Sequence, residues 1–298
     1  MSEKKYFLLL VAVFFVVGIN LTSRQAYCQN DVVQSGSENS DVPDFSQTAD
    51  DKQKKSGSSV TDMSDMNEYV RAGDEFNTQF NHKKSLENYL KANELFEDNY
   101  EVLWKLSRTF ERLGYNSVDD TAIEINYEKA MEYAQKATAI NPDGYEGHFR
   151  LAAASGRMAL LKGGKTKVRL SKDVKKHCEI SIELNSEYHL PYHTLSRWHH
   201  NVANLSWVLK AFAKIIYGGI PKASDDKAVS YMKKAILLKP DYINHHLQIG
   251  KIYMDMKDYE FAAEEFNKSL QLPAVEEDDE EHKAEAGELL EIVKKKLD

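Results

Sequence analysis

A recurring spacing of small side chains constrains this chain more than any other feature of its sequence. Within 298 residues, small or apolar side chains recur three and four positions apart in several segments, and a proline or a polar turn follows. Side chains at this spacing share one face of a helix, and small ones let two helices approach closely. The copies begin at Ala130, Val174, Ala228 and Ala262, with a weaker copy at Ser85. The chain is therefore predicted to repeat one helical unit.

A second helical pattern precedes each of these copies except the weaker one. It occupies residues 103–110, 148–155, 192–199 and 246–253. In the last unit Gly250 and Ala262 are twelve residues apart, as in a tetratricopeptide repeat of about 34 residues. The corresponding spacings are longer in the three middle units, which predicts insertions between their two helices. The predicted fold is an all-α, tetratricopeptide-like α-solenoid, a right-handed superhelix of helix pairs, with residues 280–297 as a capping helix.

One stretch of the chain, residues 195–242, carries a more specific pattern. Its distinctive residues are Arg197, Trp198, Val202, Ala203, Leu205, Ser206, Trp207, Lys210, Ala213, Pro221 and Ala228. This stretch resembles the regulator of microtubule dynamics family, and the resemblance extends over residues 66–272. The resemblance implies a tetratricopeptide-like helical domain. The family's name implies microtubules, and some of its members are membrane-anchored and implicated in lipid binding at organelle contacts.

The first 28 residues are typical of an export signal. Two lysines precede an apolar run at residues 7–19, which is shorter than the roughly 20 residues that span a bilayer. Such a run suits a secretory signal peptide, and Ala26 and Cys28 supply small residues for cleavage. We expect signal peptide 1–28 to be removed and the mature protein to be periplasmic or extracellular, away from microtubules. Two alternatives stay open, a lipid on Cys28 or an uncleaved membrane anchor.

Residues 29–63 differ sharply in composition from the rest. Ser, Asp, Gln, Gly and Asn dominate this segment, and no helical or strand period runs through it. Such a segment buries too little apolar surface to offset the entropy of ordering. It is predicted to be a disordered linker, with residues 64–298 forming the helical domain.

Several kinds of chemistry are disfavoured by the sequence. The net charge of −8 argues against nucleic-acid binding. The glycine turn at residues 159–166 lacks the preceding strand of a phosphate-binding loop, and no catalytic motif is present. Cys178 is expected to be a buried small hydrophobe, the paired histidines to pack or line a groove, and the acidic run 276–281 to be a solvated loop. We expect no enzymatic activity, no cofactor and no metal site.

Two candidate binding regions remain. The first gathers cations and aromatic rings on the face of the leading helices that lines the groove of a tetratricopeptide domain. Its residues are Trp104, Arg108, Arg112, Phe149, Arg157, His193, Arg197 and Lys251. Guanidinium groups match carboxylates and phosphates, so this face predicts an anionic ligand. The alternative is ordinary surface arginines, or a bond from Arg197 to a helix end.

The second region is an apolar stripe in the segment that joins the two helices of the third predicted pair. It consists of Leu205, Trp207, Val208, Phe212, Ile215 and Ile216. Such a stripe fits a lipid or a partner helix, or packs on the solenoid. The sequence therefore favours a binding protein whose concave face holds a protein or peptide, and the alternative is a lipid or amphiphile carrier at a membrane surface.

Overall fold

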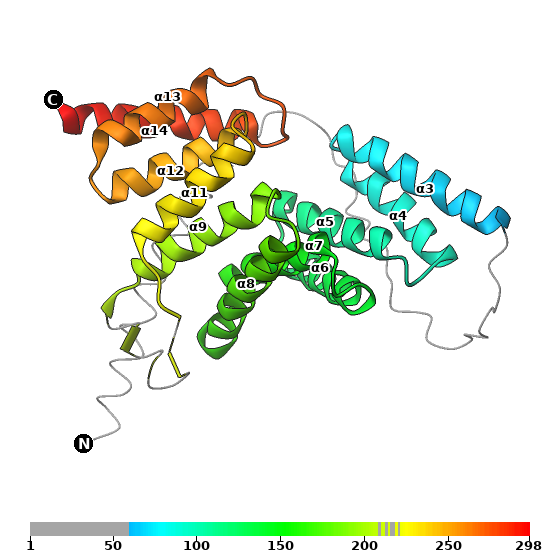
Figure 1. The fold of residues 1–298 in the computed structure, drawn as a ribbon. Helices are drawn as coiled ribbons and strands as arrows, with labels where there is room; N and C mark the ends of the chain where they lie inside the picture. The colour runs from blue at the N-terminus through cyan, green and yellow to red at the C-terminus, as the bar shows by residue number, and fades with distance from the viewer. Residues whose placement is uncertain (1–59, 208–209, 212–213, 215–217, 220) are drawn as a thin grey trace. The chain divides into compact units, whose positions relative to one another are not determined.

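The computed structural model describes residues 60–207, 210–211, 214, 218–219 and 221–298, and this part of the chain contains helices and no strand (Figure 1). The helices are α3 (Val60–Thr78), α4 (His82–Leu95), α5 (Tyr100–Asn116), α6 (Asp120–Ile140), α7 (Tyr145–Leu161), α8 (Gly164–Leu184), α9 (His189–Ala203), α11 (Asp225–Leu238), α12 (Ile243–Asp255), α13 (Tyr259–Gln271) and α14 (Asp279–Leu297). The predicted signal peptide and most of the predicted linker lie outside the described residues. Helix α3 begins at Val60, close to the predicted start of the helical domain at residue 64.

Helices that follow one another in the chain pack as antiparallel pairs. In the described part of the chain, α3 packs on α4, α5 on α6, α7 on α8, α9 on α11 and α12 on α13. The last helix, α14, packs on α12 and α13 and occupies the segment predicted as a cap. The predicted leading helices are α5, α7, α9 and α12, so the order of the pairs agrees with the sequence.

Polar side chains at the turns fix where several helices begin. The side chains of Asn81, Asn99, Asp119 and Ser224 each accept a hydrogen bond from a backbone N–H in the first turn of the next helix. These amides have no partner within the helix, so the caps stabilise the helix starts.

Two glycines show why small residues recur in the repeat. A Cβ atom on Gly250 of α12 would lie 2.5 Å from the ring of Phe266 on α13, and one on Gly73 of α3 would lie 2.5 Å from the ring of Tyr89 on α4. Both rings are fully buried. In each pair the aromatic residue follows the glycine by sixteen positions. The first pair is therefore a full copy of the unit, although sequence analysis recognised only its second helix.

The extra residues of the middle repeats lengthen helices or join them. In the pairs α5/α6 and α7/α8 they form added helical turns, and α6 and α8 each have 21 residues against 13 in α13. In the pair α9/α11 they form residues 204–224, of which part lies outside the described residues.

Small side chains fill the contacts between paired helices. Cys178 is fully buried beside Ala152 and Val174, as expected for a small hydrophobe. Burial also raises the pKa of its thiol, so it stays protonated. Among the described helices, none has the length and apolar content needed to cross a membrane.

Candidate binding surface

The leading helices lie next to one another in one layer. Helix α5 contacts α7, α7 contacts α9, and α9 contacts α12. Side chains of successive leading helices therefore meet on the inner side of the repeat, as in other tetratricopeptide architectures. We call the charged row along α5, α7 and α9 the arginine strip. It consists of Arg108, Glu111, Arg112, Arg150, Arg157 and Arg197.

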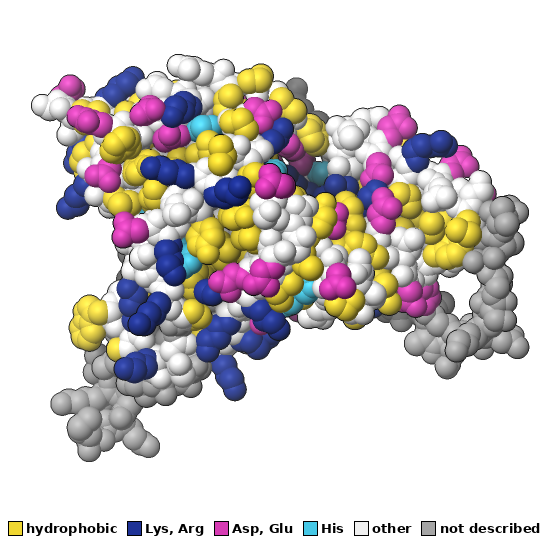
Figure 2. All heavy atoms as spheres, in the orientation of Figure 1, with side chains coloured by type: hydrophobic (Ala, Val, Ile, Leu, Met, Phe, Trp, Pro, Cys, Tyr) yellow, Lys and Arg dark blue, Asp and Glu magenta, His cyan; other side chains and the backbone are white. Residues whose placement is uncertain are grey.

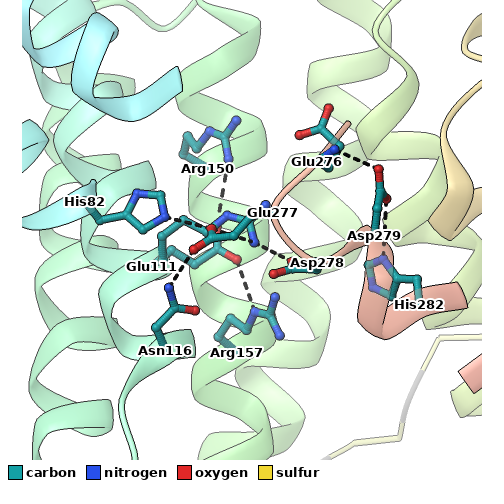
Figure 3. A network of polar contacts seen from close by, with 11 residues as sticks. His82, Glu111, Asn116, Arg150, Arg157, Glu276, Glu277, Asp278, Asp279 and His282 are labelled. Atoms are coloured by element: carbon teal, nitrogen blue, oxygen red, sulfur yellow. Dashed lines mark hydrogen bonds and ion pairs between the residues drawn. The ribbon is translucent and has the colours of Figure 1, made fainter. Parts of the chain in front are cut away.

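One carboxylate occupies the middle of the arginine strip. The Glu111 side chain accepts a hydrogen bond from Nε of Arg157 at 3.1 Å, and its other oxygen lies 3.9 Å from Nη1 of Arg150 (Figure 3). Burial alone would raise the pKa of Glu111, but the charges of Arg157 and Arg150 outweigh burial and hold it below its usual value. Glu111 is therefore ionised and offsets part of the charge of these arginines.

Arg108 has polar and aromatic neighbours, and no carboxylate of the described residues forms a hydrogen bond or ion pair with it. Its Nη2 donates to the hydroxyl of Tyr89 at 3.2 Å, and its guanidinium carbon lies 5.3 Å from the ring centre of Trp104. Its Nε is buried without a partner. Burial, followed by repulsion from Arg150, lowers the pKa of Arg108. The Arg108 guanidinium is thus held in place, and its Nε–H remains available to a hydrogen-bond acceptor.

Arg150 repeats this arrangement on α7. Its guanidinium lies over Phe149, 4.9 Å from the ring centre, and its Nη2 donates to the Tyr188 hydroxyl at 3.4 Å. Its Nε is likewise buried without a partner. The nearest carboxylate, Glu111, is beyond hydrogen-bond distance and is shared with Arg157. Two adjacent arginines on the strip thus carry unused N–H groups.

Arg197 has no hydrogen-bond or ion-pair partner among the described residues. Its side chain is exposed, yet burial and then the charge of Arg157 lower its pKa. The charge of Arg157 on α7 therefore repels Arg197, and water still reaches the Arg197 side chain. The alternative that Arg197 bonds a helix end does not hold in this structure.

Arg112, at the other end of the strip, is already occupied. Its Nη1 donates to Asp278 at 2.6 Å. Burial alone would lower the pKa of Arg112, but the charge and hydrogen bond of Asp278 raise it above its ordinary value. The neighbouring Glu277 bonds His82 and Asn116 (Figure 3). The run predicted to be a solvated loop therefore folds in part onto the protein, and that prediction was wrong for Glu277 and Asp278 and for the buried Asp279.

Comparisons with known proteins place the chain among the proteins that its sequence resembles. Residues 69–294 match the family described as regulator of microtubule dynamics protein 1-3. The chain belongs to this family. It is 26% identical to regulator of microtubule dynamics protein 2 of Mus musculus over 230 residues, and 28% identical to protein 1 of Bos taurus over 144 residues. These alignments cover 76% and 48% of this chain, and 56% and 45% of the relatives, so the chain spans about half their length.

Solved structures support the predicted fold of this family member. A thermophilic tetratricopeptide protein from Thermus thermophilus aligns with a TM-score of 0.56 at 16% identity, over 74% of this chain and 98% of that protein. Yeast Tom70 aligns with a TM-score of 0.52 at 15% identity, over 79% of this chain and 41% of Tom70. At these identities the likeness shows the fold alone, and it confirms the helical repeat.

The remaining predicted groove residues have structural partners in this member of the regulator of microtubule dynamics family. Lys251 bonds Glu285 of α14 at 2.5 Å. Phe149 is only 5% exposed, beneath Arg150 and Tyr188. Trp104 is partly buried against Arg108. The strip therefore brings together Arg108, Arg112, Arg157 and Arg197 from the predicted set, whereas Lys251 is paired with Glu285.

His193, the last of the predicted groove residues, lies in a buried cluster of three histidines. Its Nδ1 lies 2.9 Å from Nδ1 of His245, and Nε2 of His245 lies 2.9 Å from Nδ1 of His189. Burial is the main cause that lowers all three pKa values, to about 4 for His189 and about 2 for His245. The cluster is therefore neutral near pH 7. Within the described residues, no group of His, Cys, Asp or Glu is arranged to hold a metal ion.

The predicted apolar stripe is only partly described. Leu205 packs against the core cluster around Trp198 and Val202, whereas the Trp207 side chain is 79% exposed. Val208, Phe212, Ile215 and Ile216 lie outside the described residues. The family resemblance is densest in this part of the chain, and the exposed Trp207 is one of the residues that carry it.

Sequence reasoning missed Arg150 and the residues that bind the acidic run. Arg150 occupies the same position in the repeat as Lys105, just before a buried leucine, and Lys105 bonds Asp74 of α3 at 2.6 Å. The shared position in the repeat predicts that Arg150, like Lys105, reaches the neighbouring helix. No local signal links Glu277 to His82, because 195 residues separate them.

The outer surface carries a different distribution of charge. Figure 2 shows Lys and Arg side chains gathered over α8, and acidic and basic side chains interspersed over α13 and α14. Lys167 and Lys176 of α8 are exposed. Exposed lysines in water interact weakly with single partners, so they differ from the enclosed arginines of the strip.

Proposed function

We propose that this protein is a non-catalytic binding protein that holds an acidic segment of a partner protein on the arginine strip. The tetratricopeptide-like fold supports a role in protein interaction. The observation that carries the finer proposal is an imbalance of charge. Arg108, Arg150, Arg157 and Arg197 share Glu111 as the single carboxylate in hydrogen-bond or ion-pair contact among the described residues.

The geometry suits an extended acidic ligand. Cations recur on successive leading helices, and a chain laid across these helices would meet Arg108, Arg150 and Arg197 in turn. Charge-assisted hydrogen bonds to enclosed guanidinium groups contribute about 1.5–3 kcal/mol each. The rings of Trp104 and Phe149 pack against the guanidinium groups of Arg108 and Arg150. These contacts restrict both side chains and so reduce the entropy lost when a carboxylate binds.

The compartment is part of the proposal. The predicted signal peptide would place the domain in the periplasm or outside the cell, where microtubules are absent. An uncleaved N-terminal anchor would instead hold the domain beside a membrane. The exposed Trp207 favours a lipid or membrane surface as a second candidate ligand, because tryptophan is enriched at membrane interfaces.

Capture from a native extract tests the proposal. We expect the wild-type domain to retain a partner protein that elutes as salt is raised, because the contact is ionic. The Arg108→Gln/Arg197→Gln double variant should bind that partner at least tenfold more weakly, which is about 1.4 kcal/mol. Neither cation forms an ion pair with a carboxylate of the described residues, so their loss should leave the melting temperature nearly unchanged.

The matched control is Lys167→Gln/Lys176→Gln, which removes two charges from the outer face of α8. Equal weakening by the control would mean that net charge, and not the strip, governs binding. Unaltered binding by a folded Arg108→Gln/Arg197→Gln variant would refute the strip as the site. Stoichiometric lipid in the captured material, with no protein, would favour the second candidate.

A further inference from the structure

Part of the acidic run 276–281 is exposed to water, and part of it contacts the rest of the protein. It presents six successive carboxylates, three before α14 and three in the first turn of that helix. Glu276, Glu280 and Glu281 are exposed, whereas the side chains of Glu277 and Asp278 are 20% and 15% exposed. Like charges in a row repel, so such a run would remain in solvent unless specific contacts held part of it.

The contacts that hold it come from the other end of the helical domain. Glu277 Oε2 lies 2.8 Å from Nε2 of His82 on α4, and Glu277 Oε1 accepts from Asn116 at 2.9 Å. Arg112 of α5 donates to Asp278 at 2.6 Å. Figure 3 shows these side chains meeting beside Glu111 and Arg157. One edge of the arginine strip is thus filled by two carboxylates of the same chain.

The turn that presents these carboxylates is built by a different residue. Asp279 is 3% exposed, and its Oδ2 accepts from the backbone N–H groups of Val275 and Glu276 at 2.8 and 2.7 Å. Glu277 and Asp278 make none of the hydrogen bonds that close this turn. Their described polar side-chain contacts are those to His82, Asn116 and Arg112.

We propose that His82, Arg112 and Asn116 form a subsite for two successive carboxylates of an acidic partner, and that Glu277 and Asp278 occupy it as a built-in competitor. This inference rests on the proposed function, because the subsite continues the strip through Glu111. The contacts define the ligand as a peptide with two adjacent acidic side chains. An acidic partner that extends along the strip must displace the run to reach Arg112.

A tethered competitor weakens binding without blocking it. A segment joined to its own site acts at a high effective concentration, which reaches millimolar for short flexible linkers. A free peptide of the same composition must therefore exceed that concentration or bind more tightly through the rest of the strip. The built-in carboxylates would select partners with many acidic residues over those with one or two.

The experiment uses the full chain and a synthetic peptide of residues 274–281. The E277Q/D278N variant removes both competing charges and leaves Asp279, and so the turn, in place. We expect this variant to bind the peptide at least tenfold more tightly than the wild-type chain. A peptide that carries the same E277Q and D278N changes, and keeps the other four acids, should show little gain. Adding R112Q to the variant should abolish the gain.

Two results would overturn the inference. One is a folded E277Q/D278N chain that binds the peptide no better than wild type, and the other is a gain that survives R112Q. A measurement on the wild-type chain covers the case of a misfolded variant. Saturating peptide should raise the labelling of Glu277 and Asp278 by an excess of carbodiimide and amine, read by mass spectrometry, and unchanged labelling would also overturn the competition. None of these changes touches Arg108 or Arg197, so a negative result leaves the proposed function to its own test.

Discussion

Individual arginines of the strip differ in what they contact, and that difference separates structural from available cations. Arg112 is bound to Asp278 and Arg157 to Glu111, so their charges are already offset. Arg108 and Arg150 lie against aromatic rings with an unpartnered Nε, and Arg197 has no polar partner among the described residues. A free guanidinium enclosed by protein costs desolvation energy, and an anionic ligand offsets that cost.

Three histidines, the buried His245 and the half-buried His177 and His189, predict a loss of stability in mild acid. Their folded pKa values lie below the value of about 6.5 for an unfolded histidine, at about 4 for His177 and His189 and about 2 for His245. Below pH 6.5 the unfolded chain therefore binds more protons than the folded chain, and the free energy of unfolding falls as pH falls. Each neutral histidine should contribute a loss of about 1.4 kcal/mol by pH 5.5.

Urea unfolding at pH 7.5 and pH 5.5 measures this loss. His245 is fully buried between His189 and His193, so His245→Gln should reduce stability at pH 7.5 yet show a smaller further loss at pH 5.5. Equal stability of the wild-type protein at the two pH values would show that these histidines are not held neutral.

At the scale of the helices, close approach of paired helices depends on a glycine against a buried ring. This contact recurs at Gly73 with Tyr89 and at Gly250 with Phe266, at the two ends of the series of pairs. The same contact occurs in a middle pair, where a Cβ atom on Gly114 of α5 would lie 2.6 Å from the buried ring of Tyr127 on α6, whereas α7 and α8 meet through Ala152 beside Cys178. Packing at these points is dense, so an added methyl group has no space.

Glycine-to-alanine substitutions at two leading helices should have opposite effects. Gly250→Ala would place a Cβ atom 2.5 Å from the Phe266 ring and should cost about 1–3 kcal/mol of stability. Gly156→Ala on α7 is the control, because its Cβ would meet Val174 at an ordinary 3.7 Å. Gly156→Ala should be neutral or stabilise by about 0.5–1 kcal/mol, since alanine favours helices. Thermal melts that show equal effects at both positions would contradict this account of the pair.

Repeat spacing predicted the pairs because it reports local packing. The frame that aligns Ala130, Ala228 and Ala262 is set by contacts between neighbouring helices, so the sequence contains it directly. Capping side chains such as Asn99 and Asp119 are equally local. The contacts of Arg112 and His82 with the acidic run depend on how successive pairs stack, and no short-range pattern encodes that stacking. For this reason the charge pattern alone predicts that residues 276–281 lie in solvent.

At the scale of the whole helical domain, the chain is acidic but the arginine strip lies on its inner side. The net charge of the chain is −8, yet Arg108, Arg150, Arg157 and Arg197 all lie on the layer of leading helices. Helix α14 completes this layer, because it packs on α12 and its first turn contains the last three carboxylates of the run that covers Arg112. We expect the outward negative charge to disfavour anions in general, and the inner row of arginines to attract the acidic segment proposed as its ligand.

Arginine modification with phenylglyoxal, read by mass spectrometry with and without the captured partner, tests the central claim most directly. The reagent reports each arginine separately, and the exposed, unpaired Arg197 should react readily in the free protein. Bound partner should protect Arg197 and Arg108 at least several-fold. Arg71 on α3 and Arg169 on α8, which are both exposed away from the strip, should react at unchanged rates. Protection of Arg169 with continued reaction of Arg197 would place the partner on the outer face and contradict the account.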